Sequence, residues 1–448
     1  MHEKITFGSK FGTIAVVGGS VIGLGNIWRF PYLAGSNGGF AFIIVYILCS
    51  LLIAVPIMMS EFVIGRQTRS NPFGAFAKLS QNRIWSLVGL LGIVTVFCIF
   101  AFYSVVAGWA ISFFKTAIFT GFSGQEPEQI NNTFAQYINT GWQPSVVAII
   151  FVIMTGGIVV GGIKKGIERV NKILMPALAA IIVGLFFYSF SLAGFSEGMA
   201  FLLKPDFSKI NFSVVLTAIG QAFFSMSLGM GAMITYGSYI CAETSIPRLA
   251  ITIALADLTI AMLAGFAIFP GVFTYHIEPT SGPTLIFETL PLVFSQMPAG
   301  NVVGIIFFFL VFITAITSSV SMLEPIVQFA MQEFKTSRIK AVAGISGLVC
   351  IAAILCAYSQ VDNSLLRISG QNIFDFLDGV TSKFFMPISA LLIIIFVSWV
   401  AKKDMVRKQI TNNGSYFNKY YPFFRIIIQY FIPIVLLLFI LNLILNVF

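Results

Sequence analysis

Charged residues are scarce in this chain. Only 10% of its 448 residues are Asp, Glu, Lys or Arg, whereas 58% are hydrophobic, and the mean hydropathy is +0.94. A soluble domain cannot bury this much apolar surface. The composition therefore excludes a soluble protein and predicts a polytopic membrane protein, whose helices each need about 18 or more apolar residues to cross a bilayer.

Soft metal ligands are also few. The two histidines, His2 and His276, lie far apart, and the five cysteines show no metal-ligand spacing, so we expect free, buried thiols and no transition-metal centre. The N-terminus leads straight into the first apolar segment, without the pattern of a cleaved signal peptide. Linkers and low-complexity tracts are absent as well, which predicts one membrane domain over residues 1–448.

Eleven transmembrane helices are predicted, which makes the fold class all-α. With a cytoplasmic N-terminus, 20 of the 26 Lys and Arg residues fall on the cytoplasmic side, as the positive-inside rule requires. We therefore expect the protein in the plasma (inner) membrane, in contact with lipids. The net charge of +9 then reflects the membrane topology and does not indicate nucleic-acid binding. The expected spans cover residues 11–37, 39–65, 84–114, 145–161, 170–190, 213–241, 248–272, 301–330, 340–358, 370–400 and 421–446.

Four glycines interrupt the first span. The stretch GGSVIGLGNIWRFP runs from Gly18 to Pro31 and places the polar Asn26 at mid-membrane depth. Small residues often serve close helix packing, but glycine also makes a helix easy to unwind. Since backbone polar groups within a bilayer must be hydrogen-bonded, an unwound segment is tolerated only where it lines a cavity inside the protein. The clustered glycines beside an amide favour unwinding here.

A second segment repeats this pattern. Residues 220–239, GQAFFSMSLGMGAMITYGSY, place serines and glycines in the middle of the sixth span. Broken helices in corresponding positions indicate the binding site of an inverted-repeat transporter. We expect five-plus-five repeats over about residues 11–190 and 213–400, and an extra helix over about 421–446. Freed carbonyls can coordinate a cation there, and helix N-termini attract an anionic group.

Five motifs resemble those of the neurotransmitter:sodium symporter family, most closely its bacterial amino-acid branch. They are GLGNIWRFPY (23–32), EFVIGR (61–66), ERVNKILMP (168–176), GQAFFSMSLGMGAMITYGSY (220–239) and TSSVSMLEP (317–325). The resemblance covers nearly the whole chain. It implies a leucine-transporter-like fold with unwound helices 1 and 6. It also implies a symporter, not an enzyme, that imports hydrophobic or aromatic amino acids with Na⁺ by alternating access.

The resemblance further implies two sodium sites built from hard oxygen donors, which suit a small hard cation. The first would use the Val21 carbonyl and the side chains of Asn26, Ser225 and Asp257, together with the substrate carboxylate. The second, between spans 1 and 8, would use the carbonyls of Gly19, Ile22 and Thr314 and the hydroxyls of Thr317 and Ser318.

Asp257 stands where chloride-dependent members of the family carry asparagine, and Ala261 replaces a serine one turn later. A carboxylate at mid-membrane costs about 2.5–3.5 kcal/mol, so it must face a partner or a cavity. We expect it beside Tyr46, Gln221 and Ser225. There its charge would replace that of chloride, which predicts no chloride requirement. The same carboxylate is a candidate to bind a proton on the return step.

The expected substrate pocket also follows from the resemblance. Backbone amides of residues 23–25 and the Tyr103 hydroxyl would hold the substrate carboxylate, and carbonyls near Phe224 and Ser227 its ammonium group. Met230 replaces a bulky aromatic residue of a leucine-selective relative, and the flexibility of methionine predicts a broad pocket. The full set is Val21, Gly23, Leu24, Gly25, Ile99, Tyr103, Phe224, Ser227, Met230, Ser318 and Met322.

Gates are expected on both sides of this pocket. On the outer side Arg29 would pair with Asp378, above a lid made by Tyr103 and Phe224, with Asp375 as another possible partner and Lys383 without an assigned role. On the inner side Lys4 and Phe7 take the places of the family's arginine and tryptophan, Glu333 would pair with Lys4, and Tyr239 would help to close the gate. Nine residues separate Gly166 from Pro176, a spacing that lets the inner end of span 5 unwind.

Other classes remain to be distinguished. A channel would line a continuous pore with polar rings or carbonyl filters, and an intramembrane enzyme would need Asp257 and Asp378 at one site. A sensor would bind the same amino acid without transporting it. A carrier of the same fold driven by protons or by exchange would lack sodium dependence. Monomer and homodimer are both compatible with the sequence.

Overall fold

Helices make up nearly all of the described chain, which in this computed structural model comprises residues 6–125, 127–277, 285–362 and 364–445. Within these ranges nine unbroken helical segments are long and apolar enough to cross a membrane. Their helices are α4 (Phe40–Cys49) with α5 (Val55–Thr68), α7 (Ser86–Phe119), α9 (Trp142–Val160), α10 (Arg169–Ser189), α14 (Ile246–Thr274), α16 (Gly300–Glu333), α17 (Arg338–Ser359), α18 (Ile373–Val380) with α19 (Met386–Ile395), and α21 (Tyr421–Ile426) with α22 (Ile432–Leu445).

Several of these spans contain π-helical turns. They cover Ser50–Ala54, Ile163–Glu168, Thr381–Phe385, Phe396–Val400 and Ile427–Phe431. A π-turn inserts one residue into the regular hydrogen-bond ladder and often occurs where a helix serves a function. The segment Ile163–Glu168 leads into α10 and lies at the end of span 5 where unwinding is expected.

Two further spans are broken. Span 1 consists of α1 (Lys10–Val21), α2 (Leu24–Ile27) and α3 (Arg29–Ser36), and its halves meet at an angle of 70°. The sixth segment consists of α12 (Phe212–Ser225) and α13 (Ala232–Tyr239), each too short to cross a bilayer alone. With the nine unbroken segments they match the eleven predicted spans. The predicted all-α membrane fold with interrupted helices 1 and 6 is confirmed.

Shorter elements connect the spans. Residues 115–144, which lie between two predicted spans, continue α7 to Phe119 and then form the short helix α8 (Pro127–Asn139). This helix is stabilised by aromatic packing, because Phe134 lies 5.2 Å from Trp109 and 5.4 Å from Phe287 between ring centroids. The short elements are α6 (Pro72–Leu79), α8 (Pro127–Asn139), α11 (Phe195–Leu203), α15 (Leu290–Gln296), α20 (Lys403–Thr411) and the antiparallel strands β1 (Arg367–Ile368) and β2 (Gln371–Asn372), with 3₁₀ turns Arg83–Trp85, Phe207–Lys209 and Asn418–Tyr420 and the π-turn Leu285–Thr289.

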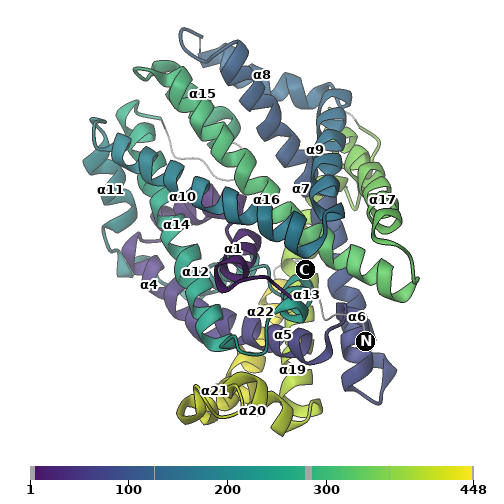
Figure 1. Ribbon diagram of the computed structural model, residues 1–448. Coiled ribbons are helices and arrows are strands. Elements are labelled where there is room, and N and C mark those ends of the chain that lie inside the picture. Colours follow the sequence, from purple (N-terminus) through teal and green to yellow (C-terminus); the bar gives the residue numbers. More distant parts are fainter. Residues whose placement is uncertain (1–5, 126, 278–284, 363, 446–448) are drawn as a thin grey trace.

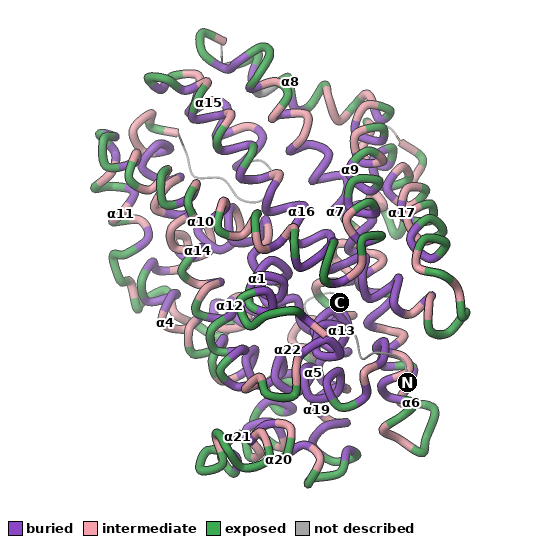
Figure 2. Tube along the Cα trace, in the orientation of Figure 1, coloured by how far each residue is buried: buried purple, intermediate pink, exposed green. Residues whose placement is uncertain are grey.

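The broken first span lies at the centre of the molecule. Figure 1 shows α1 surrounded by other spans, and α1 packs against α10, α13, α14 and α16. Figure 2 shows the same central helices as buried, whereas the exposed positions lie at the periphery. The two unwound segments are therefore shielded from lipid, which is the condition under which non-helical backbone is tolerated in a membrane.

Candidate substrate and cation site

The break in span 1 is stabilised by a side chain of its own sequence. Ile22 and Gly23 adopt extended conformations between α1 and α2. The Gly23 amide donates to Asn26 Oδ1 at 2.9 Å, and the Asn26 amide donates to the Gly23 carbonyl at 3.1 Å. This reciprocal pair of hydrogen bonds caps the N-terminus of α2, so the helical backbone resumes directly after the break. It leaves carbonyls of the last turn of α1 free to bind other groups.

The break in span 6 needs a left-handed backbone. Residues Ser227, Gly229 and Gly231 all have positive φ, at 53°, 75° and 76°. At Gly229 a Cβ atom would lie 2.3 Å from the Met386 carbonyl oxygen, so only glycine fits. Its amide donates to Glu61 Oε1 at 2.8 Å, and this carboxylate is fully buried on α5. The second span therefore binds the unwound backbone of the sixth.

Asp257 joins three other spans in one buried network. Its Oδ1 accepts hydrogen bonds from Asn26 Nδ2 at 2.6 Å and from Ser225 Oγ at 2.7 Å, and its Oδ2 accepts one from the Tyr46 hydroxyl at 3.0 Å. All four side chains are less than 5% exposed. The structure thus brings together three of the four residues expected around the first sodium, with a carboxylate as the only ionisable acid among them. Both amide atoms of the neighbouring candidate Gln221 are buried without a partner among the described residues.

A second group of oxygen atoms lies between α1 and α16. Ser318 Oγ donates to the carbonyls of Gly19 at 3.2 Å and of Ile22 at 3.4 Å. Thr317 Oγ1 donates within its own helix, to the Ile313 and Thr314 carbonyls at 3.1 Å each. Ser318 thus brings the Gly19 and Ile22 carbonyls together, whereas the Thr314 carbonyl and the Thr317 hydroxyl are bonded to each other within α16. This donor set is neutral and hard, which fits Na⁺.

The expected pocket residues surround one cavity between the two breaks. All eleven of them line it, and they are joined by Ser20, Asn26, Ser225 and Met386. The Tyr103 hydroxyl is buried there beside the Ser318 hydroxyl and the Leu24 backbone, but it forms no hydrogen bond of normal geometry within the described part of the chain. A buried hydroxyl without a partner is costly, so this group is available to a ligand in the cavity.

A wider vestibule opens on the side of the pocket away from the N-terminus. It has a volume of about 870 Å³ and shares Leu24, Tyr103 and Phe224 with the inner cavity, so these side chains separate the two spaces. Arg29 and Asp378 both line it. Among the described residues they form no direct ion pair, and the Arg29 guanidinium instead lies 5.0 Å from the centroid of the Phe224 ring. Asp375, the other possible partner, accepts a hydrogen bond from Asn372 at 2.8 Å.

The side of the N-terminus is closed by a different set of contacts. Phe7 is 2% exposed and packs on the rings of Tyr236 and Tyr239, and its amide donates to the Tyr239 carbonyl at 3.0 Å. The Tyr239 hydroxyl donates to Glu324 at 2.7 Å, and Glu324 forms a buried ion pair with Arg338. Three spans and the N-terminal segment therefore meet below the pocket.

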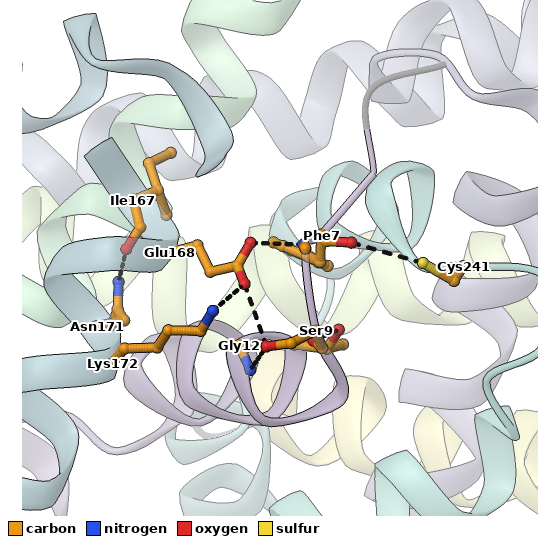
Figure 3. Close-up of polar contacts among 10 residues, drawn as sticks. Phe7, Ser9, Gly12, Ile167, Glu168, Asn171, Lys172 and Cys241 are labelled. Atoms are coloured by element: carbon orange, nitrogen blue, oxygen red, sulfur yellow. Dashed lines mark hydrogen bonds and ion pairs between the residues drawn. The ribbon is translucent and has the colours of Figure 1, made fainter. Parts of the chain in front are cut away.

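Glu168 holds the start of the first span (Figure 3). This buried carboxylate accepts hydrogen bonds from the Gly8 amide at 2.7 Å and from Ser9 Oγ at 3.4 Å, and it pairs with Lys172 at 2.6 Å. The expected partner of Lys4, Glu333, accepts a hydrogen bond from Asn71 Nδ2 at 2.8 Å. Lys4 itself lies outside the described residues.

Four charged residues of this site carried no expected role. Glu61, Glu168 and Glu324 lie within the motifs that resemble the family, but the resemblance assigns them no function. Arg338 is one of the basic residues that the positive-inside rule places on the cytoplasmic side, with no partner expected. The sequence does point to the three acidic residues, because an acidic side chain within an apolar span needs a partner or a function.

These features define a class of protein: a secondary transporter with a central site at two broken helices, one access route open and the other closed. The chain matches the Sodium:neurotransmitter symporter family over residues 4–140 and 124–447, and it belongs to this family. It is a sodium-dependent, multi-pass membrane transporter.

Individual relatives extend over nearly the full chain. It is 34% identical to the uncharacterized sodium-dependent transporter YhdH of Bacillus subtilis, covering 99% of this chain and 98% of that protein. It is 35% identical to an uncharacterized sodium-dependent transporter of Haemophilus influenzae, with 98% coverage of both. The crystal structure of MhsT in complex with L-phenylalanine is similar, with a TM-score of 0.90, 37% identity and coverage of 98% of this chain and 100% of that one.

Proposed function

We propose that this protein imports hydrophobic and aromatic amino acids together with two sodium ions, by alternating access and without chloride. The observation that carries the proposal is the buried carboxylate of Asp257, held by donors from both broken helices beside a cavity lined by all the expected pocket residues. That MhsT binds L-phenylalanine supports an aromatic substrate.

The substrate would bind as a zwitterion. Backbone amides of residues 23–25 and the Tyr103 hydroxyl would receive its carboxylate, and carbonyls near the break in α12 its ammonium group. The side chain would enter the part of the cavity lined by Ile99, Met230 and Met322. Methionine adapts its shape to different apolar groups, so this lining suits a range of large hydrophobic side chains.

The two sodium ions would be held by oxygen donors. The first would be bound by the Val21 carbonyl, Asn26, Ser225 and Asp257, and the second by the Gly19, Ile22 and Thr314 carbonyls with Thr317 and Ser318. Bound Na⁺ supplies positive charge that compensates the substrate carboxylate. Asp257 supplies a fixed negative charge, so no chloride ion is needed at this place.

Transport would use the closed and open sides in turn. The vestibule would face the outside and the N-terminal side the cytoplasm, in agreement with the distribution of basic residues. Each charge moved through 100 mV contributes about 2.3 kcal/mol. Two sodium ions therefore provide about 4.6 kcal/mol, enough for an amino-acid gradient of about a thousandfold before any sodium gradient is added.

Uptake into proteoliposomes tests this proposal. Labelled phenylalanine should accumulate with an inward sodium gradient, and replacing Na⁺ by choline should abolish uptake. Replacing chloride by gluconate should leave uptake unchanged. Competition by all twenty amino acids should rank large hydrophobic and aromatic ones first. Uptake that persists in choline, or that follows a proton gradient instead, would overturn sodium coupling.

A further inference from the structure

A buried amide on span 5 has an oxygen that nothing described in the chain binds. Asn171 lies on α10 and is 0% exposed. Its Nδ2 donates to the Ile167 carbonyl at 2.9 Å, as Figure 3 shows. Since a carbonyl can only accept a hydrogen bond, this contact determines which end of the amide is nitrogen. The Oδ1 atom therefore points away from its own helix.

The Asn171 oxygen is directed at the first span. A methyl group on Gly19 would lie 2.2 Å from Asn171 Oδ1 and 3.2 Å from Thr317 Cβ. The oxygen has no hydrogen-bond partner among the residues that the structure describes. Leaving such an atom unsatisfied in the interior costs about 1–3 kcal/mol, which points to a bound group that this atom serves.

The surroundings identify the chemistry of that group. Gly19 and Thr317, which flank the Asn171 oxygen, both belong to the set expected to hold the second sodium. The nearby donors are carbonyl and hydroxyl oxygens, and an amide oxygen is of the same hard type. We infer that Asn171 adds an oxygen from span 5 to the cation site between spans 1 and 8. This inference rests on the proposed function, because it assumes that this site binds Na⁺.

The same turn of span 5 also binds the N-terminal segment. Glu168 precedes Asn171 by three residues, so both side chains project from one face of the helix. A Cβ atom on Gly12 would lie 2.0 Å from Glu168 Oε1, which shows how closely this carboxylate approaches α1. Unwinding of span 5 at this turn would withdraw the Asn171 oxygen and release the Gly8 amide together. Sodium occupancy and closure of the N-terminal side would then be coupled.

The test measures Na⁺ binding to the purified protein, and it does not depend on transport. The variant Asn171→Leu keeps the branched shape of the side chain and removes the oxygen, and the smaller Asn171→Ala is a second variant in case the leucine variant does not fold. Asn171→Asp keeps an oxygen and adds a charge. Asn37→Ala is the matched control, because Asn37 also donates its amide to a carbonyl of its own helix, Leu33, but lies at the end of α3.

The measurement is the Na⁺ concentration that half-saturates thermal stabilisation of the purified protein without amino acid, with binding of radioactive ²²Na⁺ as a second readout. Asn171→Leu or Asn171→Ala should raise this concentration about tenfold, as loss of a supporting contact at a metal site does. Asn171→Asp should leave it at or below the wild-type value, and Asn37→Ala should not change it.

Two results would overturn the inference. One is an unchanged Na⁺ requirement in the leucine and alanine variants. The other is an equal rise in the aspartate variant, which keeps an oxygen but loses the amide donor to Ile167; it would show that this hydrogen bond, and not the oxygen, is what Na⁺ binding needs. If the wild type itself shows no Na⁺-dependent stabilisation, the proposed sodium coupling fails instead, so the two failures are distinguishable.

Discussion

Removing the charge of Asp257 while keeping its shape should make this transporter depend on chloride. In Asp257→Asn the amide oxygen can still accept from Asn26 and Ser225, which now donate at 2.6 and 2.7 Å. The new NH₂ group would face the Tyr46 hydroxyl, which can accept as well as donate. The local hydrogen bonds can therefore persist, and the main change is the loss of one negative charge.

The size of the effect follows from electrostatics. Two unit charges 4 Å apart attract by about 4 kcal/mol at an effective dielectric constant of 20. Part of this is offset because the neutral amide is easier to bury than a carboxylate. A net loss of about 2–4 kcal/mol in Na⁺ binding raises the half-saturating Na⁺ concentration about 30- to 1,000-fold.

The assay is Na⁺-dependent binding of labelled phenylalanine, with chloride or gluconate as the anion. Wild-type protein should be insensitive to the anion. Asp257→Asn combined with Ala261→Ser should bind weakly in gluconate and recover at least tenfold in chloride. Asp375→Asn, which removes an exposed carboxylate at the vestibule wall, is the control. Equal Na⁺ affinity in Asp257→Asn and wild type, or no chloride effect in the double variant, would refute the reasoning.

Three further predictions follow from buried contacts. Tyr103→Phe should lower phenylalanine affinity about 10- to 100-fold without lowering the melting temperature, because the lost hydroxyl forms no hydrogen bond of normal geometry within the described chain. A fall in stability, or unchanged affinity, would contradict this. Glu168→Gln should loosen the N-terminal segment and so accelerate alkylation of Cys241, whose thiol contacts the Phe7 carbonyl at 3.6 Å. Cys241→Ser is the control for the site of labelling, and an unchanged alkylation rate would contradict the prediction. Glu324→Gln should destabilise the protein by about 3–5 kcal/mol, since it leaves Arg338 partly buried without its counter-charge; thermal unfolding measures this, and an unshifted midpoint would contradict it.

Much of the architecture could be predicted because the bilayer limits the possible structures. Eleven apolar stretches and two clusters of glycine and serine were enough to predict the spans and their breaks. The positive φ angles at Gly229 and Gly231 now explain why the second break needs glycine. The ends of the spans were harder to predict. Helices such as α7 extend beyond the apolar stretch of the sequence, where packing of amphipathic segments determines how far the helix continues.

The site was predictable only in part, for a related reason. Motif resemblance identified the pocket residues, which converge on one cavity. It did not assign partners to Glu61 or Glu324, because their partners lie on other spans and no spacing along the chain encodes them. For Glu168 the spacing encodes only Lys172, four residues later, and not the Gly8 amide. Likewise, the expected Arg29–Asp378 contact depends on side-chain positions across the vestibule, where Arg29 instead stacks on Phe224.

The sequence by itself determined that the chain crosses the membrane many times, that two helices break near mid-depth, and which residue types stand at the breaks. Hydropathy and glycine content suffice for this, because they act locally along the chain. Only the tertiary structure decided which buried charge meets which donor and that the Asn171 oxygen faces Gly19. Those contacts join spans far apart in sequence, and in a low-dielectric interior their energies depend on distance rather than on order in the chain.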